Sequence, residues 1–239
     1  MIFNIHAGHN PAGKIGCGTV SILNESKENR IIKNEVIRQL RLLGHTVYDC
    51  TVDDGKDASD VLRRIVAKCN AHKVDLDVSI HFNSCVNDKN GDGRTTGTEV
   101  YIYNDASKTA KKYATDVCAA ISALGFKNRG VKVNPGLYVL RNTKAEAMLI
   151  EVCFLDDRDD TELYDAQAAA DAIVFGLTGQ KYKEPVIQII EGGDGAETNT
   201  GSPDAIYRVQ VGAYKNLANA KELQKRLQNA GFSSFITKA

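Results

Sequence analysis

The stretch Leu76-Asp-Val-Ser-Ile-His81 is typical of a buried β-strand, and it lies within a regular alternation of strand-like and helix-like patterns. The alternation comprises expected strands at 2–6, 46–50, 76–81, 99–103, 137–141 and 148–154, and expected helices at 26–43, 58–70, 107–124 and 166–177. This order predicts an α/β domain with a mostly parallel, twisted sheet of about six strands and helices on both faces.

The composition excludes several classes of protein. The 239 residues carry 30 Lys and Arg against 30 Asp and Glu, so the net charge is zero and no nucleic-acid partner is expected. The apolar runs are too short to cross a bilayer, so we expect no membrane insertion. The start of the chain lacks a basic, cleavable leader, which predicts synthesis in the cytoplasm without a signal peptide.

The composition changes in the last quarter of the chain. The segment 191–203 is rich in Gly, Thr and acidic residues and has almost nothing to bury, so it is typical of a flexible linker. After it, strand, helix and strand patterns at 207–214, 217–230 and 232–237 predict one small βαβ unit. We therefore expect a catalytic domain at 1–179, a linker at 180–205 and a small module at 206–239.

Two polar side chains interrupt strands that are otherwise apolar. Glu151 is the one carboxylate within Met148-Leu-Ile-Glu-Val-Cys-Phe-Leu155, and an unpaired buried carboxylate is costly enough to suggest a purpose. The alternative is a carboxylate paired with a core arginine or close to water. His81 ends the strand 76–81, where either a functional imidazole or a satisfied core histidine would fit.

His9 lies in a small-residue turn directly after the first expected strand, and ligands gather at the carboxyl ends of strands in α/β folds. His6 lies within that strand, where it is expected to be a core or supporting residue, because strand geometry does not aim both imidazoles at one point. Glu25 stands at the start of the helix 26–43, where a favourable charge at the helix N-terminus is the simpler explanation.

Together these segments resemble the zinc-dependent N-acetylmuramoyl-L-alanine amidases. The matching motifs, in chain order, are Gly8-His9, Glu25 four residues before Asn29, Ser79-Ile-His81-Phe-Asn83, Gly97-Thr-Glu99-Val-Tyr101, Val139-Leu-Arg141 and Glu151-Val-Cys-Phe-Leu155. The resemblance covers about residues 1–178. It implies hydrolysis of the amide bond between N-acetylmuramic acid and the L-alanine of the peptidoglycan stem peptide.

The resemblance also implies the roles of individual residues. His9, Glu25 and His81 would hold one Zn²⁺ and leave a coordination position open, as catalytic zinc sites do. Glu151 would be the general acid and base. Asn83 and Arg141 are candidates for contact with the substrate, although Arg141 could equally serve packing.

A second metal signal lies in residues 88–99. Asp88, Asn90, Asp92 and Glu99 occupy positions one, three, five and twelve of a twelve-residue calcium-loop pattern, and Gly93 occupies the sixth. The flanking helices of such a loop are missing, because a strand is expected from Glu99. A Ca²⁺ site and a solvated, glycine-rich loop therefore remain alternatives.

The tail, through Tyr207–Tyr214, Ala218–Leu223 and Ala230–Phe232, resembles half of a SPOR domain, a ferredoxin-like module that binds peptidoglycan glycan strands. An unrelated βαβ unit is the alternative. Because half of such a fold leaves strand edges open, we expect a homodimer through residues 206–239, with a truncated module as the rival explanation.

The sequence therefore predicts a peptidoglycan hydrolase of the endolysin or autolysin kind that acts on the bacterial cell wall after release. Two other classes remain open: a non-catalytic peptidoglycan-binding protein, and a zinc peptidase acting on stem peptides.

Overall fold

The structure is a computed structural model that describes residues 1–182, 217–229 and 236. The chain divides into two units, Met1–Lys183 and Glu184–Ala239. In the second unit the description covers helix α7 (Leu217–Asn229), which matches the helix expected at 217–230, and residue 236. The expected strands at 207–214 and 232–237 and the linker segment 191–203 lie outside the described residues, residue 236 excepted.

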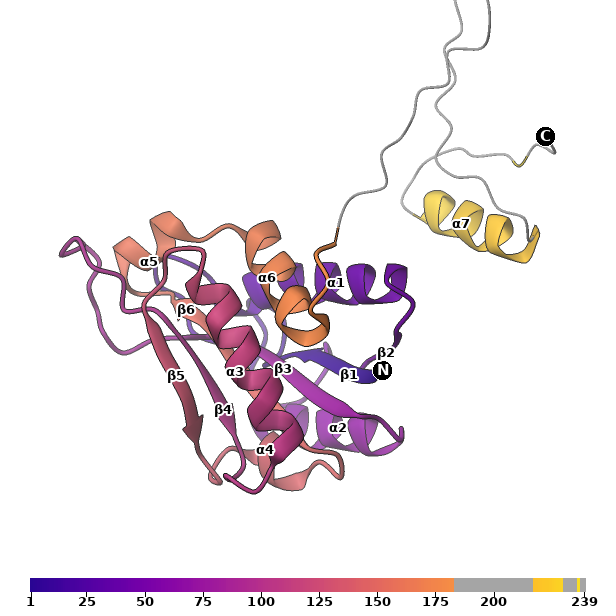
Figure 1. The fold of residues 1–239 in the computed structure, drawn as a ribbon, viewed down its shortest axis with the longest axis horizontal. Helices are drawn as coiled ribbons and strands as arrows, with labels where there is room; N and C mark the ends of the chain where they lie inside the picture. Colours follow the sequence, from indigo (N-terminus) through magenta and orange to yellow (C-terminus); the bar gives the residue numbers. More distant parts are fainter. Residues whose placement is uncertain (183–216, 230–235, 237–239) are drawn as a thin grey trace, which may run out of the picture. The chain divides into compact units, whose positions relative to one another are not determined.

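The first unit is built on one sheet whose strands have the order β2-β1-β3-β6-β4-β5 (Figure 1). The strands are β1 (Ile2–Ala7), β2 (Thr46–Asp49), β3 (Leu76–Asn83), β4 (Thr98–Ile102), β5 (Asn128–Val133) and β6 (Ala147–Phe154). Neighbouring strands are parallel except for β4 and β6, which are antiparallel. The prediction of a mostly parallel sheet with six strands is confirmed.

Helices cover both faces of this sheet (Figure 1). They are α1 (Glu25–Leu42), α2 (Ala58–Asn70), α3 (Lys108–Ser122), α4 (Tyr138–Asn142), α5 (Arg158–Leu163) and α6 (Ala166–Thr178). Apolar residues of α1, α3 and α6 form the larger core with one face of the sheet. Residues of α2 and α4 form a smaller core on the other face.

Local sequence signals explain where the first helix begins and ends. The side chain of Asn24 caps α1 by accepting a hydrogen bond from the amide of Lys27 at 3.1 Å. Gly44 follows the helix at φ 86°, a left-handed conformation that glycine adopts without strain. This cap sets Glu25 in the first helical turn, close to the carboxyl ends of β1 and β3.

The prediction of a strand at 137–141 was wrong, because residues Tyr138–Asn142 form the helix α4. Val139 and Leu140 are both buried, against α2 and the sheet. Neighbouring residues of a strand point to opposite faces, whereas one helical turn can bury both on the same side. A short apolar run does not distinguish these two solutions by its pattern.

Two elements were not predicted. β5 (Asn128–Val133) is an edge strand whose sequence, Asn-Arg-Gly-Val-Lys-Val, is polar and contains a glycine, so it lacks the apolar pattern of a buried strand. The helix α5 (Arg158–Leu163) spans only six residues, capped by Asp157, whose side chain accepts a hydrogen bond from the amide of Asp160. It is too short to show a helical period.

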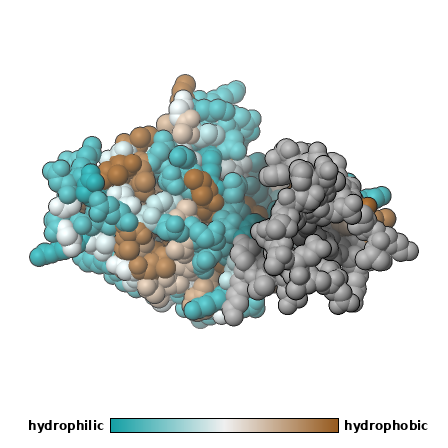
Figure 2. Space-filling model, turned by 90° about the horizontal axis from the view of Figure 1, so that it is seen from above, coloured by the Kyte–Doolittle hydropathy of each residue, from teal (hydrophilic) through white to brown (hydrophobic). Residues whose placement is uncertain are grey.

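Figure 2 shows that the described residues on one face are mostly hydrophilic, with small hydrophobic areas between them. Among the described helices, none is both long enough and apolar enough to cross a bilayer.

Candidate metal centre

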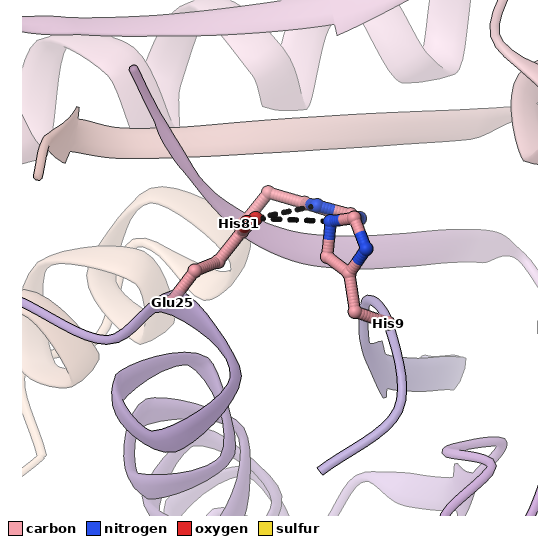
Figure 3. A group of neighbouring side chains, drawn as sticks. All are labelled: His9, Glu25 and His81. Atoms are coloured by element: carbon pink, nitrogen blue, oxygen red, sulfur yellow. Dashed lines mark hydrogen bonds and ion pairs between the residues drawn. The ribbon is translucent and has the colours of Figure 1, made fainter. Parts of the chain in front are cut away.

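Three predicted ligands meet at the carboxyl edge of the sheet (Figure 3). His9 lies in the loop after β1, Glu25 in the first turn of α1, and His81 near the end of β3. Oε1 of Glu25 lies 3.3 Å from Nε2 of His9 and 3.0 Å from Nδ1 of His81. One donor atom from each residue lies within 4.8 Å of the other two.

This donor set fits a zinc ion. Zinc in proteins prefers imidazole nitrogen, carboxylate oxygen and thiolate, at about 2.0–2.2 Å for nitrogen and oxygen. Ligand atoms in a tetrahedral site with these bond lengths are roughly 3.3–3.5 Å apart, which is close to the two separations measured to Glu25. Two imidazoles and one carboxylate are also the protein ligands of a catalytic zinc site with one open position.

The backbone around Gly8 allows the imidazoles to approach each other. A Cβ atom placed on Gly8 would lie 1.9 Å from Cε1 of His81, so only glycine fits at this position. His9 itself has φ 62°, a left-handed conformation that is uncommon for residues other than glycine and that often occurs at functional sites. The turn is therefore shaped to bring His9 beside His81, with ring centroids 4.9 Å apart.

The Glu25 carboxylate is held in place by the backbone as well as by the histidines. Its Oε1 accepts a hydrogen bond from the amide of Phe82 at 3.3 Å, and its Oε2 accepts one from the amide of Thr19 at 3.1 Å. Burial by itself raises the pKa of Glu25, but hydrogen bonds with His81 and His9 outweigh burial and hold the pKa well below its usual range. The Glu25 side chain is therefore a carboxylate at neutral pH, the form that could bind a metal.

His6 and His81, two histidines near this centre, both favour the neutral form. Burial lowers the pKa of His81 even though Glu25 lies beside it, and a neutral imidazole is the form that binds a metal. Burial lowers the pKa of His6 to about 3, and the neighbouring His81 adds to this shift. His6 is 1% exposed, lies 3.4 Å from Ser79 Oγ through Nδ1 and is not part of the ligand group, as its place in the strand predicted.

Two residues that support the turn were not predicted to have a role. Asn29 donates from Nδ2 to the carbonyl of Gly8 at 3.1 Å, and Arg30 donates from Nη2 to the carbonyl of His9 at 2.8 Å. Both come from α1, one turn after Glu25. Asn29 already stood in the Glu25–Asn29 motif, and its spacing of four places it beside Glu25 on the helix, whereas no spacing signal singles out Arg30.

Glu151 lies on the strand next to His81 and in register with it. Paired residues of neighbouring strands point to the same face of a sheet and are about 4.8 Å apart. Oε2 of Glu151 is buried and has no hydrogen-bond partner within the described part of the chain. Burial raises the pKa of Glu151 well above its usual range, and the charges of Glu25 and Glu99 add to this effect. Within the described residues, Glu151 is not paired with a core arginine, which was one of the two alternatives.

Both carboxylate oxygens of Glu99 have partners on other strands of the sheet or on β4 itself. Its Oε1 accepts hydrogen bonds from Nδ2 of Asn83 at 2.8 Å and from the hydroxyl of Tyr101 at 2.7 Å. Its Oε2 pairs with Nε of Arg129 at 2.5 Å and with the ammonium of Lys132. Asn83, a candidate substrate contact, is the last residue of β3 and is bonded to Glu99 through its side chain.

The structure does not assemble the predicted calcium loop. Glu99, which would be its twelfth ligand, is committed to Arg129 and Lys132 instead. Asp88 accepts a hydrogen bond from the amide of Gly91, and Asp92 accepts one from the amide of Arg94. The structure therefore does not support Asp88, Asn90, Asp92 and Glu99 as one Ca²⁺ ligand set, because Glu99 lies in β4 and pairs with cations of β5.

Asp88 instead lies in a different acidic group, with Asp157 and Asp159. Asp157 accepts hydrogen bonds from the amide and hydroxyl of Thr96, and Asp159 accepts them from the amides of Asp92 and Gly93. These bonds tie the loop 88–97 to the start of α5.

Arg141 lies away from the three ligands. It is an exposed residue of α4, and its guanidinium lies 5.9 Å from the centre of the Tyr138 ring. Its proposed contact with substrate stays a prediction.

Comparison with known proteins identifies two matching domains in this chain. Residues 4–178 match the family model described as N-acetylmuramoyl-L-alanine amidase, and residues 202–239 match the SPOR domain. An uncharacterized 38.4 kDa protein of Clostridium perfringens is 35% identical over 165 residues, which are 69% of this chain and 46% of that protein. The sporulation-specific N-acetylmuramoyl-L-alanine amidase of Bacillus subtilis is 28% identical over 163 residues, 68% of this chain and 56% of that protein.

A solved structure supports the same assignment. The catalytic domain of the CD27L endolysin targeting Clostridia difficile aligns with a TM-score of 0.65 and 27% identity, over 77% of this chain and 99% of that domain. The chain spans about half the length of the first curated relatives that it matches. Because the family model covers most of the chain, the chain belongs to the N-acetylmuramoyl-L-alanine amidase family.

Proposed function

We propose that this protein hydrolyses the amide bond between N-acetylmuramic acid and the L-alanine of the peptidoglycan stem peptide. The observation that carries the proposal is the position of Glu151, in register with the ligand His81 at the edge where His9, Glu25 and His81 converge. Hydrolysis of an amide needs an activated water, a polarised carbonyl and a group that moves a proton. At this edge of the sheet, the three converging side chains would hold the metal that serves the first two tasks, and Glu151 would serve the third.

His9, Glu25 and His81 would hold the zinc ion in this proposal. Bound zinc supplies a Lewis acid, which lowers the pKa of a coordinated water to about 7 and polarises a carbonyl oxygen. The chain holds these ligands rigidly, because Glu25 is fixed by the amides of Phe82 and Thr19. Such support around ligands commonly determines metal affinity.

Glu151 would move the proton. Its carboxylate would accept a proton from the attacking water and pass a proton to the nitrogen of L-alanine as the carbon–nitrogen bond breaks. The result is a free lactyl carboxylate on the sugar and a free amine on the stem peptide. Burial of the Glu151 carboxyl and its raised pKa support this role, since both protonation states must be accessible.

The C-terminal segment would direct the enzyme to its substrate. Residues 202–239 match the SPOR domain, and we propose that they bind peptidoglycan. The endolysin or autolysin role, action on the cell wall after release, and a homodimer through residues 206–239 belong to this proposal as well.

Digestion of purified peptidoglycan tests the proposal. The wild type should release stem peptides with N-terminal alanine, identified by labelling of new amines and mass spectrometry. Glu151→Gln should retain its zinc and its melting temperature but lose about 10²–10⁴-fold in rate. Other new amines would identify a peptidase, and an absence of new ends would identify a non-catalytic binding protein. Loss of zinc from Glu151→Gln would assign Glu151 as a ligand instead.

A further inference from the structure

Two cations of the edge strand β5 converge on Glu99. Arg129 pairs with Oε2 of Glu99 through Nε, and Lys132 pairs with the same oxygen through its ammonium. The Glu99 side chain is 2% exposed, whereas the side chains of Arg129 and Lys132 are 29% and 36% exposed. The carboxylate is therefore buried beneath two cations that solvent and ligands can reach.

The charges in this cluster do not cancel. Two cations face one carboxylate, and that carboxylate is already saturated, because Asn83 and Tyr101 donate to its other oxygen. Within the described residues, neither Nη atom of Arg129 has a hydrogen-bond partner, since Nε alone makes the bond to Glu99. The guanidinium is also held by the ring of Phe154, 4.9 Å from its centre. A fixed arginine with both Nη groups free to donate is suited to bind a carboxylate.

The cluster lies in the same row of the sheet as the metal ligands. Glu99 is the register partner of Glu151, which in turn is the register partner of His81. With strands about 4.8 Å apart, the charged ends of Arg129 and Lys132 lie one to two strand spacings, roughly 5–10 Å, from Glu151. An extended peptide advances at most about 3.3–3.6 Å per residue. The second stem residue after the scissile amide therefore lies at a distance from Glu151 that Arg129 and Lys132 can reach.

We propose that Arg129 and Lys132 bind the free α-carboxylate of the acidic residue that follows L-alanine in the stem peptide. The inference rests on the proposed amidase function. On the sugar side the lactyl carboxyl is consumed by the scissile amide and carries no charge, so the anionic groups of the substrate are those of the stem. The proposal makes Arg129 and Lys132 specificity-determining residues that favour stems in which this carboxylate is not amidated.

The test uses two muropeptides that differ only in this group, one with the free α-carboxylate on the second stem residue and one with the amide. We expect wild type to favour the free acid at least about tenfold in kcat/KM, which corresponds to 1.4 kcal/mol. Arg129→Gln and Lys132→Gln should each remove most of this preference, mainly by raising KM for the acid. Cleavage of the amidated substrate should stay within about threefold of wild type.

Two matched variants sharpen the test. Lys127→Gln removes one exposed positive charge two residues before Arg129, outside the Glu99 cluster, and should keep the preference. Arg129→Lys keeps the positive charge but loses the two-pronged guanidinium, and it should keep part of the preference for the free acid. Calorimetry with Glu151→Gln, which holds intact substrate, gives an independent readout: the acid should bind more tightly than the amide, and Arg129→Gln should abolish the difference.

Three results would overturn the proposal: no preference in wild type, equal losses on both substrates in Arg129→Gln and Lys132→Gln, or equal binding of acid and amide. Failure of the proposed function is a different result, in which wild type cleaves neither muropeptide at the lactyl amide.

Discussion

Arg30 holds the backbone of the candidate ligand His9 through the His9 carbonyl. Its Nη2 donates to the carbonyl of His9 at 2.8 Å, its Nη1 donates to the carbonyl of Gly8 at 3.3 Å, and its Nε donates to Asp53 at 2.9 Å. The side chain is 16% exposed. One guanidinium thus connects α1 to the left-handed turn that carries a candidate metal ligand, and we expect Arg30 to position that turn.

Arg30→Met removes these donors and keeps a side chain of similar length. We expect zinc affinity to fall by about 10–100-fold while the fold is retained, as for other residues that support ligands. Titration against a competing chelator measures this change. Arg64→Met is the matched control, because Arg64 pairs with Asp54 at an exposed site and should not affect zinc binding. Equal zinc affinity in Arg30→Met and wild type would contradict the positioning role.

Gly8→Ala should eliminate zinc binding. The added methyl would lie within 1.9–2.7 Å of three atoms of the His81 ring, so the imidazole must leave its present position. Zinc content by atomic absorption and lysis of purified walls should both drop to the background. Gly136→Ala is the control, because the nearest atom to its Cβ is a side-chain oxygen at 3.1 Å in an exposed loop. A Gly8→Ala protein with full zinc content would show that the turn can rearrange.

Replacement of any ligand should remove the metal. His9→Ala, Glu25→Ala and His81→Ala should each bind less zinc and lose wall lysis, and chelation of wild type should abolish activity that added zinc restores. His72→Ala is the control, since His72 stacks on Tyr48 and lies outside the ligand group. A variant that keeps normal zinc and full activity would exclude its residue from the site.

Glu35 predicts a pH dependence of stability that is independent of the site. Hydrogen bonding to Arg38 is the main cause that lowers the pKa of Glu35 to about 2, and Gln39 and Gln167 contribute. Since the pKa is lower in the folded state, the stabilisation is present above the usual Glu pKa of 4.5 and is lost as pH falls toward 2.

Urea unfolding of wild type and Glu35→Gln measures this effect. The difference in midpoint should be largest above pH 5 and should shrink as pH decreases toward 2. A difference that does not change with pH would mean that charge on Glu35 is unimportant.

The homodimer through residues 206–239 stays a prediction from the sequence, since most of these residues lie outside the described part of the chain. Light scattering at micromolar concentration, with and without residues 206–239, measures it. The full chain should have twice the mass of one copy and the shortened chain the mass of one. A monomeric full chain would eliminate the dimer.

Most of the sheet was predictable because its signals are local. The segment 58–70 shows the period of an amphipathic helix, and 148–154 is the nearly continuous apolar run of a strand buried on both faces. The polar residues His81 and Glu151 were recognisable because each contradicts an apolar strand pattern. The ligand set as a whole came from the order of motifs that resembles the amidase family.

Only the tertiary structure decided which side chains meet. Glu25 and His81 are 56 positions apart, and their contact depends on how α1 packs beside β3. Glu99 fits a calcium loop by spacing, but β4 places it in a sheet beside β5, where Arg129 and Lys132 neutralise it. Local periodicity determines the elements of this protein, whereas long-range packing determines their partners, because packing depends on chain segments that no sequence window contains together.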